Sequence, residues 1–352
     1  MNELQQILIA TAKAYPLASV SDYIKLIYQN EFGNAHMKES GMNLSAELRK
    51  EAFYGQSGAH LFEKIGNGYY RIYLKNAMEV GASPDTIYKM CMATAAQAHG
   101  SQDRFLDKLE FFYRMTRDGK LPLSEGALRL YMLNYEAAGF PAVHHSAAYK
   151  TAYHPAYRVV HQEFARFFEL FLRVDHILQT SIDPILIAID GPCASGKSTL
   201  ARLLAYCYDC NVFHTDDFYL RQEQRTPERL KEVGGNMDRE RLMQEVLEPI
   251  AHQQSVVLRP YSCKTQSILS ETKLPVKRLN IIEGSYSLHP SLRQYYQIKI
   301  ALNVSDEEQL NRLKRRESRK SLEAFQELWI PMERDYISQT DLLNFADLVY
   351  NS

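Results

Sequence analysis

The pattern of apolar and polar positions changes character about halfway along the chain. Up to about residue 180, apolar residues recur at helical spacing, and no stretch shows convincing β alternation. This spacing predicts amphipathic helices over residues 4–14, 21–32, 44–52, 70–80, 84–98, 102–116, 124–138 and 159–178. We therefore expect residues 1–180 to form an all-helical domain, whose role its sequence does not indicate.

From Asp183 onward, short apolar runs alternate with helical stretches. The predicted strands are residues 185–189, 212–214, 279–282 and 297–303. Strands alternating with helices are typical of a parallel sheet covered by helices on both faces. We expect a second domain over residues 181–352 with an α/β fold, and a domain boundary near residues 179–183.

A complete phosphate-binding loop of the form G-x-x-x-x-G-K-S follows the first predicted strand and precedes a helix. Strand, glycine loop and helix together are the context that confirms this motif. Its backbone N–H groups would cradle a polyphosphate, Lys197 would bridge the terminal phosphates, and the Ser198 hydroxyl would ligate Mg²⁺. The expected ATP-binding residues of the loop are Gly191, Ala194, Ser195, Gly196, Lys197, Ser198 and Thr199. The alternative is a chance match with Lys197 as a solvated helix residue.

Acidic residues stand at the ends of two further predicted strands. Asp216 and Asp217 follow residues 212–214, and Glu283 follows residues 279–282. In open α/β sheets, ligands bind at the carboxyl ends of the strands, where a carboxylate can accept a proton or hold a metal. Asp216 is the candidate proton acceptor, and Glu283 has the Walker B position near Mg²⁺. The alternative for both aspartates is a turn or helix cap.

Four arginines near the C-terminus have the spacing of one helical face. A capping box at Ser305 opens the predicted helix, and the arginines fall at i, i+3, i+4 and i+7: Arg312, Arg315, Arg316 and Arg319. Like charges on one face repel unless an anion neutralises them, and a triphosphate would do so. We expect Arg316 to act in catalysis and Arg315 and Arg319 to bind ATP. A solvated basic face is the alternative.

These motifs together carry a resemblance to a known family. The segment from about residue 185 to 350 resembles the uridine kinase and phosphoribulokinase branch of P-loop kinases, and bacterial uridine kinase-like proteins most closely. The matching pieces occur in family order and are residues 191–198, 215–219, 235–238, 259–261, 282–284 and the Arg315-Arg316 pair.

The resemblance implies roles for particular residues. It makes Asp216 the general base for an acceptor hydroxyl, Asp238 a ligand of ribose hydroxyls and Glu283 a residue that places Mg²⁺, with the arginines as a lid over the phosphates. From the sequence alone, Asp238 is equally suited to capping a helix. Asp217, Tyr219 and Tyr261 are further candidate substrate-binding residues, and the tyrosines are alternatively core aromatics.

One departure from the family concerns the acceptor. Uridine kinases carry a histidine that reads the pyrimidine edge, and this chain has Gln266 at that place. Phosphoryl transfer is therefore better supported than a uridine acceptor, because changes in such contacts can move specificity entirely. The leading hypothesis is an ATP-dependent kinase of a nucleoside or another polyol. The alternative is a nucleotide-dependent sensor or regulator whose helical half binds a partner.

Composition narrows the remaining classes of function and partner. A net charge of −1 gives no electrostatic drive toward nucleic acid, and no apolar stretch approaches the length of a membrane span. We expect a cytoplasmic protein that acts on a small hydroxyl compound, with a homo-oligomer left open. Five cysteines make no disulfide framework, and Cys207-x-x-Cys210 is interpreted as a helix end and turn. The histidines at positions 36, 144, 145 and 154 match no standard metal spacing and favour capping or packing.

Overall fold

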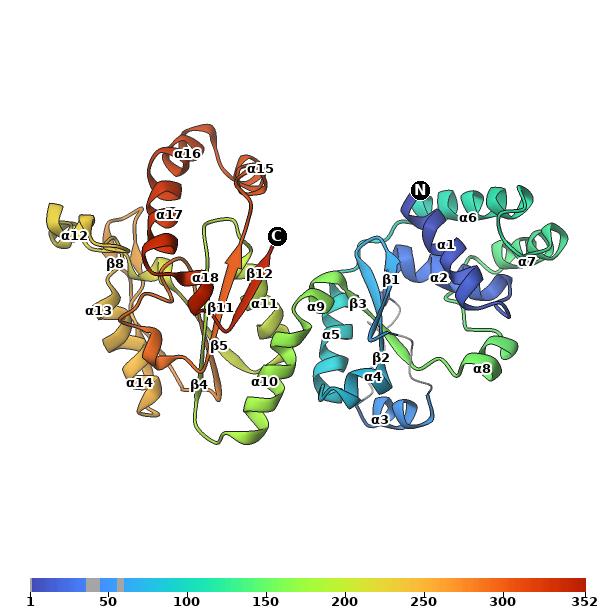
Figure 1. Ribbon diagram of the computed structural model, residues 1–352, viewed down its shortest axis with the longest axis horizontal. Coiled ribbons are helices and arrows are strands. Elements are labelled where there is room, and N and C mark those ends of the chain that lie inside the picture. The colour runs from blue at the N-terminus through green and yellow to red at the C-terminus, as the bar shows by residue number, and fades with distance from the viewer. Residues whose placement is uncertain (1, 36–44, 56–59) are drawn as a thin grey trace. The chain divides into compact units, whose positions relative to one another are not determined.

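Helix α10 (Phe168–Thr180) contains the division of the chain into two units, Met1–Asp175 and His176–Ser352. The computed structural model describes residues 2–35, 45–55 and 60–352, and Figure 1 shows its elements. His36 lies outside the described residues, and so does Leu44, the expected start of the helix over residues 44–52. Each unit is described below by itself.

The first unit is mainly helical but contains strands. Its helices before α10 are α1 (Asn2–Ala14), α2 (Val20–Phe32), α3 (Ser45–Tyr54), α4 (Leu74–Glu79), α5 (Pro84–Ala96), α6 (Gln102–Arg117), α7 (Glu125–Ala137), α8 (Ala147–Tyr153) and α9 (Gln162–Arg166). Its strands are β1 (Phe62–Gly66), β2 (Tyr69–Tyr73) and β3 (Tyr157–His161). They form an antiparallel sheet in the order β1-β2-β3.

The expectation of an all-helical first domain is therefore wrong at two places. Residues 70–80 and 159–178, each predicted as one helix, begin as strands β2 and β3 and become helical only afterwards. Gly66-Asn67-Gly68 is the hairpin turn between β1 and β2, with φ of 81°, 53° and 79° at its three residues. These positive φ values suit glycine and asparagine, and a turn of this kind between Tyr- and Ile-rich segments favours a hairpin.

His145, for which the sequence favours capping or packing over metal binding, belongs to the packing of the first unit. The carboxylate of Asp22 accepts a hydrogen bond from Nδ1 of His145 at 2.7 Å, and Nε2 of His145 then accepts from the hydroxyl of Tyr157 at 2.5 Å. The His145 side chain is 6% exposed, and burial lowers its pKa to about 4. Within the described residues, no group of three or more His, Cys, Asp or Glu side chains is arranged to hold a metal ion.

The second unit alternates strands and helices. Its helices after α10 are α11 (Lys197–Cys207), α12 (Pro227–Lys231), α13 (Arg239–Leu242), α14 (Glu248–Ala251), α15 (Asp306–Arg316), α16 (Arg319–Ala324), α17 (Ile330–Gln339) and α18 (Leu342–Phe345). Its strands are β4 (Ile185–Asp190), β5 (Cys210–His214), β6 (Val256–Leu258), β7 (Tyr261–Ser262), β8 (Ser267–Ile268), β9 (Thr272–Leu274), β10 (Leu279–Glu283), β11 (Ile298–Asn303) and β12 (Leu348–Asn351). Its 3₁₀ turns are η2 (Thr215–Phe218), η3 (Gln222–Gln224) and η5 (Arg293–Tyr295), and its π-helical turns are η4 (Met243–Leu247) and η6 (Phe325–Trp329).

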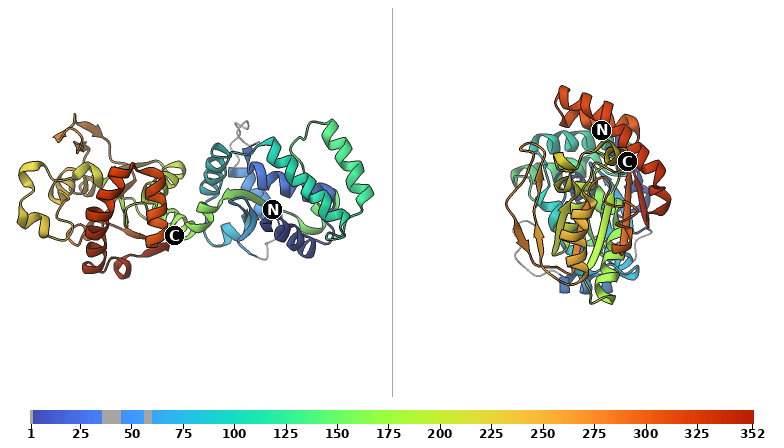
Figure 2. Two further views of the ribbon diagram at one scale, coloured as in Figure 1. Left: turned by 90° about the horizontal axis from the view of Figure 1, so that it is seen from above. Right: turned by 90° about the vertical axis from the view of Figure 1, so that its left-hand side faces the viewer.

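Five strands of the second unit form one parallel sheet in the order β12-β11-β4-β10-β5. Every residue of the central strand β4 is buried, as expected for a strand covered on both faces. Helix α11 packs on β4, β5 and β10. The other face carries a core that includes Leu186, Phe213, Ile282 and residues of α13, α17 and α18. Figures 1 and 2 show helices of this unit on both sides of the sheet.

The four strands predicted in this half are present, and the parallel α/β architecture of a P-loop NTPase is confirmed. Cys207 closes α11 and Cys210 opens β5, and neither is in a disulfide, so the C-x-x-C spacing marks a helix end and turn. None of the helices in the described residues is long and apolar enough to cross a membrane.

We predict that His145 makes the folded first unit sensitive to mild acid. Because its folded pKa lies near 4, below the ordinary 6.5, the unfolded chain binds this proton first, so the stabilisation is complete above pH 6.5 and is lost as the pH falls toward 4. The loss is on the order of 3 kcal/mol, at about 1.4 kcal/mol per pKa unit. Denaturant unfolding at several pH values should show a flatter profile for His145→Gln. The same slope in His145→Gln and in the exposed control His144→Gln would contradict this role.

Candidate active site

Three neighbouring strands deliver the candidate site residues to one edge of the sheet. In the parallel register, Glu283 at the end of β10 pairs with Ile189 of β4 on one side and with His214 of β5 on the other. The glycine loop after β4 and the acidic turn η2 after β5 therefore emerge beside Glu283. This carboxyl edge is where open α/β sheets bind their ligands.

The glycine loop has the backbone that its sequence predicts. Gly191 has φ of 140°, and a Cβ there would lie 2.2 Å from the carbonyl oxygen of Leu302, so only glycine fits. The N-cap of α11 is Gly196 at φ 104°. Lys197 is 8% exposed, and its Nζ donates to the carbonyl oxygens of Gly191 and Pro192 at 2.9 Å each. The ammonium is thus held inside the loop, where it can exchange these oxygens for those of a phosphate.

Asp190, at the end of β4, holds the loop in place and was not anticipated from the sequence. This fully buried carboxylate accepts hydrogen bonds from the N–H of Gly191 at 2.6 Å, the N–H of Tyr286 at 3.1 Å and the N–H of Leu288 at 2.7 Å. A fourth comes from the hydroxyl of Tyr336 on α17 at 2.6 Å. Burial raises the pKa of Asp190, and these donors oppose the shift.

Helix α17 also contacts the loop through Glu333, another residue that sequence patterns did not single out. Its carboxylate accepts from the N–H of Cys193 at 2.8 Å and from the hydroxyl of Ser285 at 2.6 Å. Burial first, and then Glu333, raise the pKa of Cys193 to about 12, so the thiol in the loop stays protonated and is no nucleophile. Nothing in the local sequence of α17 signals this contact, because it depends on how the helix returns to the sheet.

The two predicted metal-site residues lie together. The Ser198 hydroxyl donates to Oε1 of Glu283 at 3.0 Å, and Nδ1 of His214 contacts the same oxygen at 2.6 Å. The pKa of Glu283 is lowered, chiefly by His214 against the opposing effect of burial, and Glu283 raises that of His214. A hydroxyl and an ionised carboxylate are oxygen donors of the kind Mg²⁺ takes, so the residues fit this ion.

Asp216 and Asp217 occupy the turn η2, directly after β5. Asp216 is exposed and accepts a hydrogen bond from the hydroxyl of Tyr219 at 3.2 Å, which leaves its carboxylate open to a ligand. Asp217 is partly buried, and burial followed by the Asp216 charge raises its pKa although His214 opposes this. The Tyr219 ring lies 6.1 Å from that of Trp329. The arrangement suits Asp216 better than Asp217 as an accessible proton acceptor.

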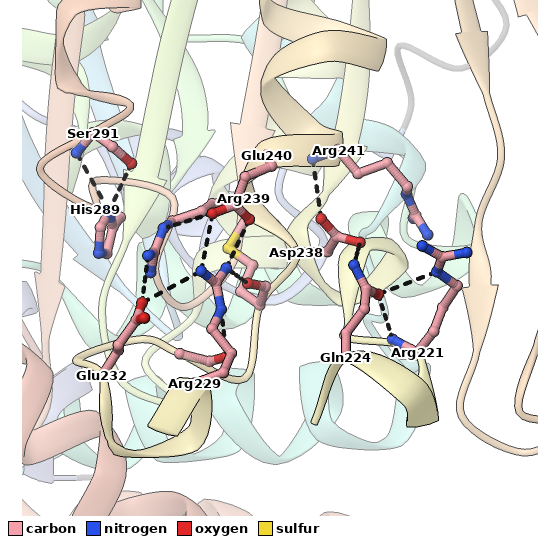
Figure 3. Close-up of polar contacts among 12 residues, drawn as sticks. Arg221, Gln224, Arg229, Glu232, Asp238, Arg239, Glu240, Arg241, His289 and Ser291 are labelled. Carbon is pink, nitrogen blue, oxygen red and sulfur yellow. Dashed lines mark hydrogen bonds and ion pairs between the residues drawn. The ribbon is translucent and has the colours of Figure 1, made fainter. Parts of the chain in front are cut away.

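The other candidate substrate-binding residues are more enclosed. Asp238 is 3% exposed and is the N-cap of α13: its carboxylate accepts from the N–H of Arg241 at 3.1 Å and from the amide of Gln224 at 2.9 Å (Figure 3). The Tyr261 ring is buried, and its hydroxyl has no hydrogen-bond partner. Gln266 is exposed at the turn of the β7–β8 hairpin, with φ of 52°.

The four arginines do not form one helical face. Helix α15 ends at Arg316, and Ser318 caps a new helix that begins at Arg319, so Arg319 is displaced from the expected row. Arg312 contacts the glycine loop through a hydrogen bond from Nη1 to the carbonyl oxygen of Ala194 at 3.1 Å. Arg315, Arg316 and Arg319 are exposed. The expectation of a single basic helix face is therefore wrong for Arg319, because a serine cap restarts the helix.

Comparisons with known proteins place solved small-molecule kinases among the structures similar to this chain. A possible uridine kinase from Bacillus stearothermophilus matches 52% of this chain and 99% of its own, at 20% identity and a TM-score of 0.38. A protein provisionally described as a fructose transport system kinase, from Silicibacter sp. TM1040, matches 48% of this chain and 91% of its own, at 24% identity and a TM-score of 0.41. Shikimate kinase from Bacteroides thetaiotaomicron matches 47% and 86%, at 15% identity and a TM-score of 0.26.

No family model matches the chain, and no curated protein matches it. The identities and TM-scores of the similar structures are low.

We predict that Ser198→Ala and Glu283→Gln each raise the Mg²⁺ concentration needed for half-maximal nucleotide turnover by about tenfold or more, the usual cost of disturbing a metal's surroundings. Asp209→Asn is the control, because it removes an acid that lies just before the opposite end of β5 and pairs with Lys277. Metal titrations that coincide for all four proteins, wild type included, would remove Ser198 and Glu283 from the metal site.

Proposed function

We propose that this chain is an ATP-dependent kinase that transfers a phosphoryl group to a hydroxyl of a small molecule. The observation that carries the proposal is the meeting, at one edge of a parallel sheet, of a glycine loop with its buried lysine and an exposed carboxylate on the next turn. A nucleotide-binding site alone needs no such acid. A kinase does, because the acceptor hydroxyl must lose a proton as it attacks.

Each residue has a role that follows from its place. Lys197 would neutralise charge on the transferring phosphoryl group, and Ser198 and Glu283 would hold Mg²⁺, which supplies further charge neutralisation when bound. Asp216 would take the proton of the acceptor hydroxyl. Arg316, at the end of α15, would approach the phosphates from the lid formed by α15 and α16. Catalysis would come from positioning and electrostatics, with no covalent intermediate on the protein.

Two classes of acceptor are compatible with the proposal. The resemblance to uridine kinases favours a nucleoside, with Asp238, Tyr219 and Tyr261 as its contacts. The exposed turn position of Gln266, in place of a base-reading histidine, favours a polyol without a base. A panel of nucleosides, sugars and other polyols, assayed for acceptor-dependent ADP release, distinguishes them.

We predict that Asp216→Asn retains ATP binding while acceptor-dependent turnover falls by about 10²–10⁴-fold, the usual worth of a positioned base. The carboxamide keeps the size of the side chain but cannot take the proton. Asp217→Asn is the matched comparison, and we expect a smaller loss of turnover from it. Lys197→Ala should abolish phosphoryl transfer.

Nucleotide affinity, melting temperature and turnover are measured on each variant. A loss of about 1 kcal/mol of stability with normal turnover would make Asp216 a turn cap only. ATP hydrolysis that no acceptor stimulates, in wild type and variant alike, would favour the sensor hypothesis instead.

A further inference from the structure

Three arginines gather beside the candidate base, on the acceptor side of the site. They are Arg221, just before η3, Arg241 on α13, and Arg259, in the segment between β6 and β7. Arg241 is the central one. Burial lowers its pKa most, Glu245 and Asp238 oppose this shift, and the nearby charges of Arg259 and Arg221 lower the pKa further. None of the three was singled out among the expected site residues.

Arg241 is buried yet incompletely bonded. It is 8% exposed, and its guanidinium lies 4.7 Å from the centre of the Phe218 ring. Nη2 donates to the carbonyl oxygen of Asp217 at 2.5 Å, which places the group within one residue of Asp216. Nη1 and Nε are buried without a hydrogen-bond partner. A buried charged donor without an acceptor is costly, so such a group calls for a ligand.

The acids nearby leave Nη1 of Arg241 without a partner. Oε1 of Glu245 is shared by Nη2 of Arg259 at 2.6 Å and, at a longer 3.5 Å, by Nε of Arg241. Asp238 gives both of its oxygens to other donors, the backbone N–H of Arg241 and the amide of Gln224. One carboxylate therefore serves two guanidinium groups.

Arg221 adds a third positive charge at the same place. Its Nε is held by the side chain of Gln224 at 3.1 Å, and Nη1 lies 3.3 Å from the exposed Glu223. Figure 3 shows the guanidinium groups of Arg221 and Arg241 pointing toward one another. Two like charges held together repel, and an anion between them would turn this repulsion into attraction.

We propose that Arg221 and Arg241 form an anion subsite, so that the acceptor is a hydroxyl compound that also carries a phosphate or carboxylate group. This inference rests on the proposed kinase function and narrows its substrate class. The subsite lies on the Asp217 side of the turn η2, whereas the terminal phosphates of ATP belong at Lys197. The second oxygen of Glu245 is buried and has no hydrogen-bond partner, so it can accept a hydrogen bond from a further hydroxyl of the same acceptor.

The test uses the full chain and acceptors in matched sets of three: a neutral polyol or nucleoside, its phosphate monoester and its carboxylate. We expect at least one anionic member to exceed its neutral partner by about 10²-fold or more in kcat/KM, as a site built to bond a group rejects analogues that lack it. The anionic member with the higher kcat/KM, phosphate or carboxylate, identifies the group that the subsite binds.

The arginine variants then assign this preference to the subsite. Arg241→Met keeps an apolar stem over Phe218 and should lower kcat/KM for the preferred anionic acceptor by about 10²-fold, mainly through KM, with the KM for ATP little changed. Arg241→Lys should recover part of the loss. Arg221→Met, at a half-exposed position, should lose about tenfold and serves if Arg241→Met does not fold. Arg229→Met is the control, because Arg229 is fully engaged by Glu240, Gly235 and Met237.

The outcomes separate this inference from the proposed function. Neutral acceptors used as well as anionic ones, with Arg221→Met unchanged and Asp216→Asn inactive, would overturn the subsite and leave the kinase. Arginine variants that weaken ATP binding rather than acceptor use would also overturn it, since the anion would then belong to the nucleotide. ATP consumption without any acceptor dependence would overturn both.

Discussion

The buried carboxylate of Asp190 is the constraint on which the rest of the site depends. It receives four hydrogen bonds from three separate segments: the start of the glycine loop, the turn after β10, and α17. A carboxyl group in a fully buried place is unfavourable unless its oxygens are hydrogen-bonded, so these bonds tie the three segments to β4. The lysine of the loop, the acid of β10 and the contact from Glu333 then follow from that arrangement.

Local signals in the sequence were sufficient for the architecture of the second unit and for the residues of its edge. Buried parallel strands are short apolar runs, and the glycine loop is recognisable by itself, so 185–189 and Gly191 to Ser198 were predicted correctly. Glu283 and Asp216 could be placed at one edge because parallel strands end together. Asp190 and Glu333 could not, since their partners are up to 146 residues away in the sequence and nothing nearby in the chain marks them.

In the first unit, the sequence was a poorer guide to secondary structure. The segments that became β2 and β3 contain Tyr, Arg, Val and Ile in an order compatible with a half-buried helix, and their strand pairing is decided by contacts between distant residues. Only the Gly66-Asn67-Gly68 turn gave a local hint of the hairpin. The same holds for Arg319, where the single residue Ser318 ends one row of arginines by capping a new helix. Short capping residues can override a periodic pattern that spans several turns.

The charges near Asp216 bear on why the proposed kinase need not take a uridine-like substrate. The proposed base, Asp216, is positioned by the end of β5 and would serve any hydroxyl that reaches it. What reaches it depends on the groups behind the turn η2. Here those are Arg241, which is buried with Nη1 unpartnered and Nε only 3.5 Å from Glu245, and Arg221 beside it. Meanwhile the hairpin residue Gln266 is turned out to solvent. Because the desolvation of Arg241 is already part of the folded structure, an anionic group would gain the attraction without ordering the arginine on binding, which is the advantage of a preorganised site.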